Sequence, residues 1–154
     1  MSGSGTFIGT VYQANVIAMA LAHMLAELPL NWIRNSEDIP ISISCETGGS
    51  GDDFAISTSQ QPYTFEVQAK SGLTAGDQLA TCIEKIFARV TDTSHLKTVI
   101  VTDGTKSLKK LRDFQRDLDR IESGRVDELS QTTRELASTL GISPNQLNRL
   151  SASF

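Results

Sequence analysis

Apolar positions in the first half of the chain change from a helical spacing to a strand-like alternation. Over residues 10–28 apolar side chains recur every three or four positions, which predicts a helix that Pro29 ends. Its buried stripe is expected to contain Val16, Ile17, Ala20, Leu21, Met24 and Leu25. Residues 41–46, 51–57 and 65–70 then alternate between apolar and polar side chains. They predict three strands, because successive side chains of a strand point to opposite faces.

The second and third of these strands place polar side chains on a common face. Their inward face is expected to consist of Phe54, Ile56, Phe65, Val67 and Ala69. If the turn at residues 59–62 pairs the two strands, the other face gathers Asp53, Glu66, Gln68 and Lys70. Glu46 ends the preceding strand on its polar side, and a glycine-rich turn leads from it to Asp52 and Asp53.

The second half of the chain predicts a crossover helix, a buried strand and more helix. Helical spacing covers residues 75–90 and 108–121, and residues 96–101 form a continuous apolar run. A run of this kind is typical of a strand buried in a sheet with parallel members. The expected fold is therefore α/β, with a mixed central sheet flanked by helices.

Two carboxylates, an amide and an ammonium on one surface suit metal-dependent phosphodiester hydrolysis. A hard cation with oxygen ligands polarises the phosphate and lowers the pKa of an attacking water. Asp53 is expected to hold Mg²⁺ together with Glu66 or Gln68, and Lys70 to stabilise the developing charge. Whether Asp52 or Asp53, and whether Glu66 or Gln68, binds the metal is left open by the sequence.

The order of these residues resembles a known superfamily. An acid, a glycine-rich turn, Asp52-Asp53 and then Gln68-Ala69-Lys70 resemble the PD-(D/E)xK nucleases, and the Gln-x-Lys form is similar to Mrr-like restriction endonucleases and to nuclease domains of bacterial anti-phage effectors. The opening at residues 6–14 (TFIGTVYQA) is also similar to those effector nucleases. The resemblance covers residues up to about the end of the predicted buried strand.

The resemblance implies a restriction-endonuclease-like fold and a set of site residues. Asp53 and Gln68 would take metal positions, Lys70 that of the catalytic lysine, and Glu46 that of an upstream acid, with Mg²⁺ or Mn²⁺ as the cofactor. It further implies a DNA endonuclease; double-stranded DNA is the expected substrate, and single-stranded DNA and RNA stay open. Such a domain would be the effector of a larger anti-phage defence protein, activated by homo-oligomerisation through regions beyond this chain.

Charge is unevenly distributed along the chain. The formal net charge is −4, and up to Lys70 seven acids face only two cations, Arg34 and Lys70. Cations gather later, on one side of the predicted third helix: Lys109, Arg112, Arg116 and Arg120. That side is either a phosphate-binding surface or an ordinary solvated face, since Asp113, Asp117 and Asp119 lie among the cations.

Other features favour a globular protein in the cytoplasm. No apolar run approaches the roughly 20 residues of a membrane span, and the N-terminus lacks the basic start of a signal peptide. Cys45 and Cys82 occupy apolar positions and are expected to be buried thiols, without a disulfide or zinc site.

The composition changes near Glu122, which predicts a nuclease-like domain at residues 1–121 and a helical extension at residues 122–154. Residues 135–143 resemble the first helix and turn of a helix-turn-helix motif, in which Gly141 makes the left-handed turn. Asn145, Gln146, Asn148 and Arg149 would then face DNA bases. A helical hairpin or a linker to a missing module is the alternative.

Two other function classes remain open at this stage. A DNA-binding regulator would use the C-terminal helices and need no metal. An assembly domain would contact no nucleic acid, which the acidic balance favours.

Overall fold

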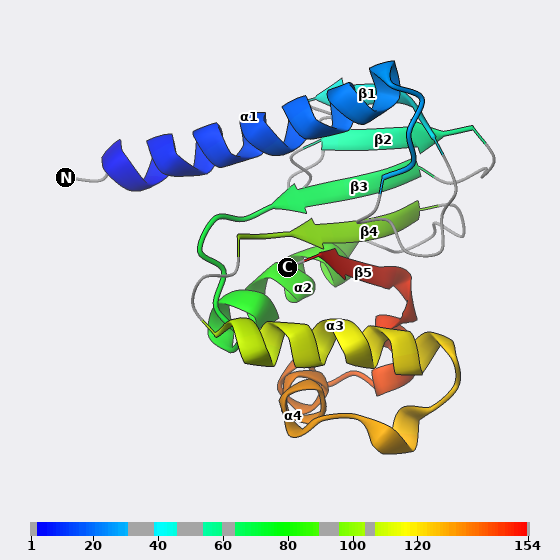
Figure 1. Cartoon of the computed structure of the whole chain (residues 1–154). Coiled ribbons are helices and arrows are strands. Elements are labelled where there is room, and N and C mark those ends of the chain that lie inside the picture. Colours follow the sequence, from blue (N-terminus) through cyan, green and yellow to red (C-terminus); the bar gives the residue numbers. More distant parts are fainter. Residues whose placement is uncertain are drawn as a thin grey trace.

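Five strands form one mixed sheet between two layers of helices (Figure 1). The computed structural model describes residues 3–30, 39–45, 54–59, 64–89, 96–103 and 107–153. The helices are α1 (Gly3–Leu25), α2 (Asp77–Arg89), α3 (Leu108–Glu122) and α4 (Gln131–Leu140), with 3₁₀ helices η1 (Val126–Glu128) and η2 (Pro144–Arg149). The strands are β1 (Pro40–Cys45), β2 (Phe54–Thr58), β3 (Thr64–Ala69), β4 (Leu96–Val101) and β5 (Leu150–Ser153).

The strands lie in the order β1-β2-β3-β4-β5. β2 runs antiparallel to both β1 and β3, whereas β3, β4 and β5 are mutually parallel. Helix α2 makes the crossover that parallel neighbours require. The α/β class, the mixed sheet and its flanking helices are therefore confirmed.

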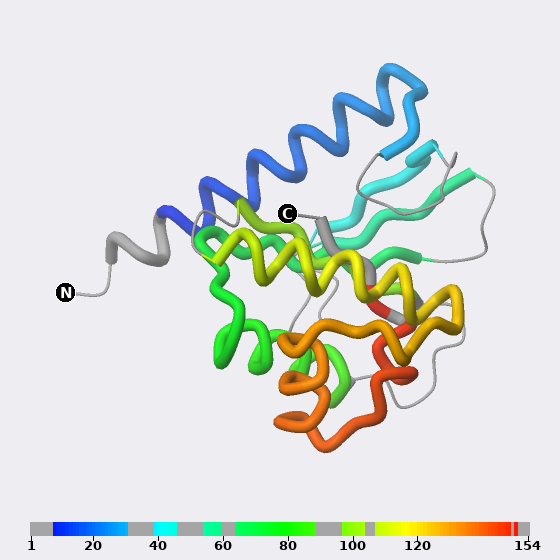
Figure 2. Tube along the Cα trace, turned by 60° about the horizontal axis from the view of Figure 1, so that its bottom comes forward, coloured from blue at the N-terminus to red at the C-terminus, as the bar shows by residue number. Residues whose placement is uncertain are grey.

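Two hydrophobic clusters occupy the two faces of the sheet. On one face α1 contributes Val16 and Ala20 to a cluster with apolar side chains of β2, β3 and β4. On the other face Ile100 of β4 packs with α2, α3 and α4. The alternation along β4 explains the division, because Val99 and Val101 point away from Ile100. In Figure 2 α1 lies on one side of the strands, and α2 and α4 lie on the other.

Helix α1 buries less of its surface than its sequence pattern predicts. The helix begins near Gly3 rather than at Thr10, and the chain turns at Glu27, where φ is 52°. Of the expected stripe, Val16 and Ala20 are buried, but Leu25 is 81% exposed. The reason is geometric, because one side of the helix alone faces the sheet and its N-terminal half extends past the strands (Figures 1 and 2).

Strand β1 departs from simple alternation. Its pairing with β2 shifts register between Pro40 and Ser42, which leaves Ile41 60% exposed. Cys45 at its end is exposed, so the expectation of a buried thiol is wrong there, whereas Cys82 is buried as expected. An irregular edge strand of this kind is a poor template for pairing with another sheet.

The expectation of a separate C-terminal helical extension is corrected by the structure. Residues 122–154 contribute β5, which pairs with β4 from Thr98↔Leu150 to Val101↔Ser153. Leu129, Leu136, Leu147 and Leu150 belong to the same core cluster as α2 and α3. The composition change at Glu122 is therefore a turn between packed elements and not a boundary in the core.

We expect Leu147→Ala to lower the free energy of unfolding by about 3 kcal/mol, since it empties a fully buried position. Urea denaturation followed by circular dichroism measures this, with exposed Asn148→Ala as the control. A single transition that shifts to lower urea is the expected result. A loss below about 1 kcal/mol, or two separate transitions, would contradict a shared core.

A buried carboxylate on α3 links this helix to the start of α4 by hydrogen bonds. Asp117 is fully buried, and its Oδ2 accepts hydrogen bonds from Ser130 N at 2.8 Å, Ser130 Oγ at 2.5 Å and Thr133 Oγ1 at 2.6 Å. Its Oδ1 accepts from Arg120 Nη1 at 2.9 Å. Ser130 is also the N-cap of α4. Sequence periodicity gave no sign of this role, because Asp117 stands in a run of charged residues and its spacing does not set it apart from them.

Candidate functional site

The predicted site residues are divided between described and undescribed parts of the chain. Glu46, Asp52 and Asp53 lie outside the described residues, so the structure says nothing about their positions. Glu66 and Gln68 lie on β3, and Lys70 follows the strand directly. The described part of the site is therefore the carboxyl end of β3.

The pairing expected between the second and third strands is present. β2 and β3 pair antiparallel, with Phe54 opposite Val67 and Ala55 opposite Glu66. Phe54 and Val67 face the α1 side, which places Glu66 and Gln68 on the opposite face of the sheet. That face is less open than predicted, because Ala55 is buried and Gln68 is only 5% exposed. The helices that pack around Ile100, the neighbour of Gln68 on β4, explain the difference.

Gln68 carries a buried amide with no hydrogen-bond partner for its side chain among the described residues. Buried side-chain amides are almost always paired, because an unpaired polar group in the interior costs about 1–3 kcal/mol. Glu66, two residues earlier on the same face, is half-buried and does take part in an interaction. The described residues therefore leave the partner of the Gln68 amide unassigned.

The backbone around Lys70 is held firmly by the end of β4. Lys70 N donates to Val101 O at 2.9 Å, which extends the parallel pairing by one residue. Asp103 accepts from Ser71 Oγ at 2.8 Å and from Gly72 N at 2.5 Å. Gly72 has φ of 66°, a conformation that a side chain at this turn would strain. These bonds fix the direction in which the half-buried Lys70 side chain leaves the sheet.

Tyr12 on α1 is close enough to Asp103 for the charge of that carboxylate to affect it. Burial and the negative charge of Asp103 raise the pKa of Tyr12 to about 12. The phenol therefore keeps its proton at neutral pH and is a hydrogen-bond donor. Tyr12, Ser71 and Asp103 were missed by the sequence reasoning. Asp103 had one usable signal, because it follows a buried strand and the carboxyl ends of parallel strands meet at one edge.

The described residues alone do not form a metal centre. No group of three or more His, Cys, Asp or Glu side chains able to share a cation is found within the described ranges. What they provide is an oxygen donor at Gln68, a carboxylate at Glu66 and a cation at Lys70. Of these groups, the oxygens of Gln68 and Glu66 are of the kind that Mg²⁺ or Mn²⁺ binds, and two such residues alone do not complete a site.

The cations on α3 do not form one continuous basic surface, because two of the arginines are paired with nearby oxygens. Arg116 pairs with Asp113 at 2.7 Å, and Arg120 donates to Asp117 and to the backbone oxygen of Glu128. Arg120 is therefore part of the internal network, and among the described residues Lys109, Lys110 and Arg112 are the exposed cations near the start of the helix. This favours a solvated helix over a continuous phosphate-binding surface.

The helix-turn-helix expectation is wrong in its second half. Gly141 does make the predicted left-handed turn, with φ of 64°. The element after it is the six-residue 3₁₀ helix η2, whose Leu147 is fully buried, and the chain then enters β5. Asn145, Gln146 and Asn148 are exposed, but no α-helix carries them to a DNA groove.

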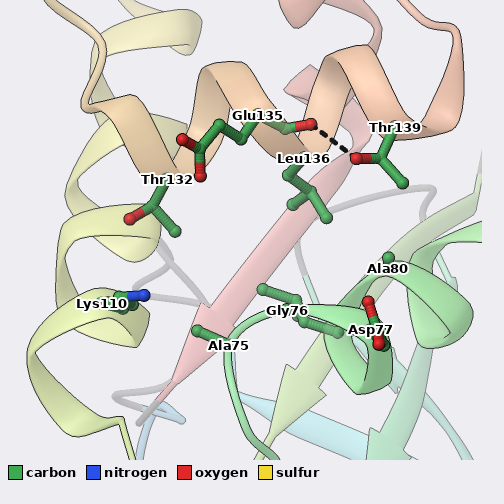
Figure 3. A pocket seen from close by; sticks show the side chains of 10 residues that line it. Ala75, Gly76, Asp77, Ala80, Lys110, Thr132, Glu135, Leu136 and Thr139 are labelled. Carbon is green, nitrogen blue, oxygen red and sulfur yellow. Dashed lines mark hydrogen bonds between the residues drawn. The ribbon is translucent and has the colours of Figure 1, made fainter.

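A separate cavity of about 220 Å³ lies between the start of α2 and α4. Gly76, Asp77, Lys110, Thr132 and Glu135 line it (Figure 3). Two carboxylates and one ammonium give it mixed charge. Glu135 already accepts a hydrogen bond from Gln131 Nε2 at 2.7 Å, and Thr139 Oγ1 donates to its backbone oxygen at 2.9 Å. The cavity therefore presents no matched set of donors or acceptors for one ligand.

Comparison with known proteins gives no family. No protein-family model matches the chain, and neither a curated protein nor a solved structure shows significant similarity to it. What is established is the α/β fold with a mixed sheet, and function has to be argued from the residues at the end of β3.

Proposed function

We propose that the chain is a metal-dependent DNA endonuclease of the PD-(D/E)xK type, with a restriction-endonuclease-like sheet. The observation that carries the proposal is the buried amide of Gln68, which has no side-chain partner among the described residues, two residues before Lys70 at the carboxyl end of β3. The order of helix, three strands, crossover helix and parallel strand supports it, because this is the order that the motif requires.

Neighbouring positions are compatible with a complete ligand set. Asp53 directly precedes Phe54 in the sequence, and Phe54 pairs with Val67, the residue before Gln68. A cation bound between Asp53 or Asp52 and Gln68 or Glu66 would polarise the phosphate and activate a water. Glu46 is the further acid that the motif supplies.

The remaining roles belong to the chain's own groups. The Lys70 ammonium would stabilise the negative charge that develops on the phosphate oxygens. The Ser71–Asp103 hydrogen bond would hold the loop that aims Lys70. Cleavage of double-stranded DNA in the cytoplasm, within a larger anti-phage protein activated by oligomerisation, extends the same proposal.

Metal binding is tested by adding Mn²⁺ to isotopically labelled protein and recording amide NMR spectra. Paramagnetic broadening is expected at Gln68, Lys70 and Ser71, and not on α4. Gln68→Leu should reduce the broadening at Lys70, because Leu fills similar space without an oxygen ligand. Gln115→Leu on α3 is the matched control. Broadening that is absent, or that is unchanged in Gln68→Leu, would contradict Gln68 as a ligand.

A further inference from the structure

Helix α1 presents a long apolar face that nothing in the described structure covers. Of the large hydrophobic side chains that are exposed, most lie on α1 or just after it: Ile8, Val11, Met19, Leu21, Leu25 and Leu28. Leu25 is 81% exposed and Ile8 57%. Helical spacing places Val11, Leu21 and Leu25 on the side away from Val16 and Ala20, which face the sheet, and Ile8 and Met19 on one flank of that side.

This face also lacks charge. The sequence contains no Asp, Glu, Lys or Arg before Glu27, and the first cation is Arg34. An exposed helix of a monomer normally carries charged side chains on its outer face. In a protein of net charge −4, an uncharged surface is also the place where two copies can meet without repulsion.

Small residues run along the middle of the face. Ala14, Ala18 and Ala22 follow one another at intervals of four and are all exposed. Alanines at this spacing let two helix axes approach to about 8 Å, while Leu21 and Leu25 fill the grooves beside them. The face is therefore shaped to receive another helix.

Beyond the C-terminal end of α1 the apolar surface continues onto β1. A cavity of about 360 Å³ lies between Met24, Glu27 and Ile41, so the surface is uncharged along α1 but includes an acid at this end. With Ile41 included, the exposed apolar side chains offer on the order of 700 Å², close to the about 800 Å² that each partner buries in a standard interface. The surface is thus large enough for a specific contact between two copies, without being large enough for an obligate one.

We propose that a second copy of this chain covers this face, with α1 packing against α1 about a two-fold axis. A two-fold contact brings the same patch onto itself, which an uncharged face with a central row of alanines permits. The proposal stands apart from the nuclease proposal, because it uses none of the residues at the end of β3.

A lipid surface is the other occupant to consider. α1 is the one helix of the described chain that is long and apolar enough to cross a membrane, with a mean hydropathy of 1.3 over Ile8–Leu25. This qualifies the expectation from the sequence that no such segment exists. Spanning would remove Val16 and Ala20 from the core, and binding to an anionic surface would require Lys or Arg beside the apolar face. The residues therefore favour a protein partner.

Sedimentation of the 154-residue chain between about 1 and 500 µM tests the proposal. The wild type is expected to shift from monomer to dimer with concentration, and Ala22→Glu to raise the half-dimer concentration at least ten-fold, about 1.4 kcal/mol. Ala88→Glu, at an exposed alanine of α2, should behave like the wild type. Circular dichroism of each variant checks that it is folded.

Two results would overturn the proposal. The first is a wild type that stays monomeric over the whole range, or a dimer that Ala22→Glu leaves intact. The second is a monomer that floats with vesicles of phosphatidylcholine and phosphatidylserine and loses this binding in Ala22→Glu, which would assign the face to a membrane. A supporting result is an intermolecular disulfide in Ala18→Cys, made in a Cys45→Ser background because Cys45 is exposed.

Discussion

Lys70→Ala is expected to lower the rate of DNA cleavage by at least about 100-fold, while leaving the protein folded. Its ammonium is the cation closest in sequence to the Gln68 amide, and the hydrogen bond from Lys70 N to Val101 O survives the substitution because it uses the backbone. The substitution should lower the rate of cleavage without lowering the free energy of unfolding, because the Lys70 side chain is only half-buried.

The control for this prediction is Lys85→Ala, an exposed lysine of α2 whose removal changes net charge by the same amount. Both variants are compared with the wild type in plasmid cleavage under single-turnover conditions. Equal rates for Lys70→Ala and Lys85→Ala would mean that charge alone matters, and that Lys70 has no place in the chemistry.

Asp117→Asn is expected to lower the free energy of unfolding by about 3 kcal/mol. The amide keeps the shape of the carboxylate but brings an N–H donor against Ser130 N or against Arg120, both of which donate to Asp117 now. Asp113→Asn on the same helix, where the pair with Arg116 is more exposed to solvent, should cost less than about 1 kcal/mol. Urea denaturation distinguishes the two, and similar costs would contradict a buried anchor at Asp117.

The same network makes stability depend on pH. Burial alone would raise the pKa of Asp117, but the hydrogen bonds from Ser130, Thr133 and Arg120 outweigh it and hold the pKa below the ordinary value of 3.8. The carboxyl group of Asp117 therefore binds a proton more readily in the unfolded chain than in the folded one. Its contribution to the free energy of unfolding is complete at pH values above 3.8, and it is lost as the pH falls through the lower pKa of the folded state. Asp117→Asn should show a shallower loss of stability in that acidic range than the wild type.

Much of the fold could be predicted because its strands obey simple rules. The apolar run of β4 predicts a strand covered on both sides, and the alternation of β3 predicts a strand with one buried face; the structure has both strands. β1 was predicted less well, because the register shift after Pro40 breaks the two-residue period and exposes Ile41. A shift of this kind depends on the neighbouring strand and leaves no local mark in the sequence.

The C-terminal segment shows where local patterns mislead. Gly141 and Ser143 are correct signals for a turn and a new helix start, and Gln146 Oε1 accepts from Ser143 N as a helix start requires. Whether six or twelve helical residues follow is decided by packing, which buries Leu147 and draws Leu150 into the sheet. The sequence therefore resembles a DNA-binding motif only as far as the turn, because tertiary contacts determine the structure after it.

For the candidate site, the sequence predicted which residues share a face but not how enclosed that face is. Period-two alternation correctly separates Gln68 from Val67. It could not show that Gln68 is buried, since this depends on helices that pack around Ile100. The role of Asp103 depends on a loop contact with Ser71, 32 residues away in the chain, which no local pattern reveals.

The most direct test of the nuclease proposal is plasmid cleavage by the wild-type chain with Mg²⁺, compared with EDTA and with the Asp53→Ala and Lys70→Ala variants. The protein should be assayed at up to about 100 µM, so that weak association does not hide the activity. We expect nicking or linearisation with Mg²⁺ that EDTA and each substitution abolish. Cleavage that persists in EDTA or in both variants, or a folded wild type that cuts no DNA at any concentration, would contradict a metal-dependent nuclease site at the end of β3.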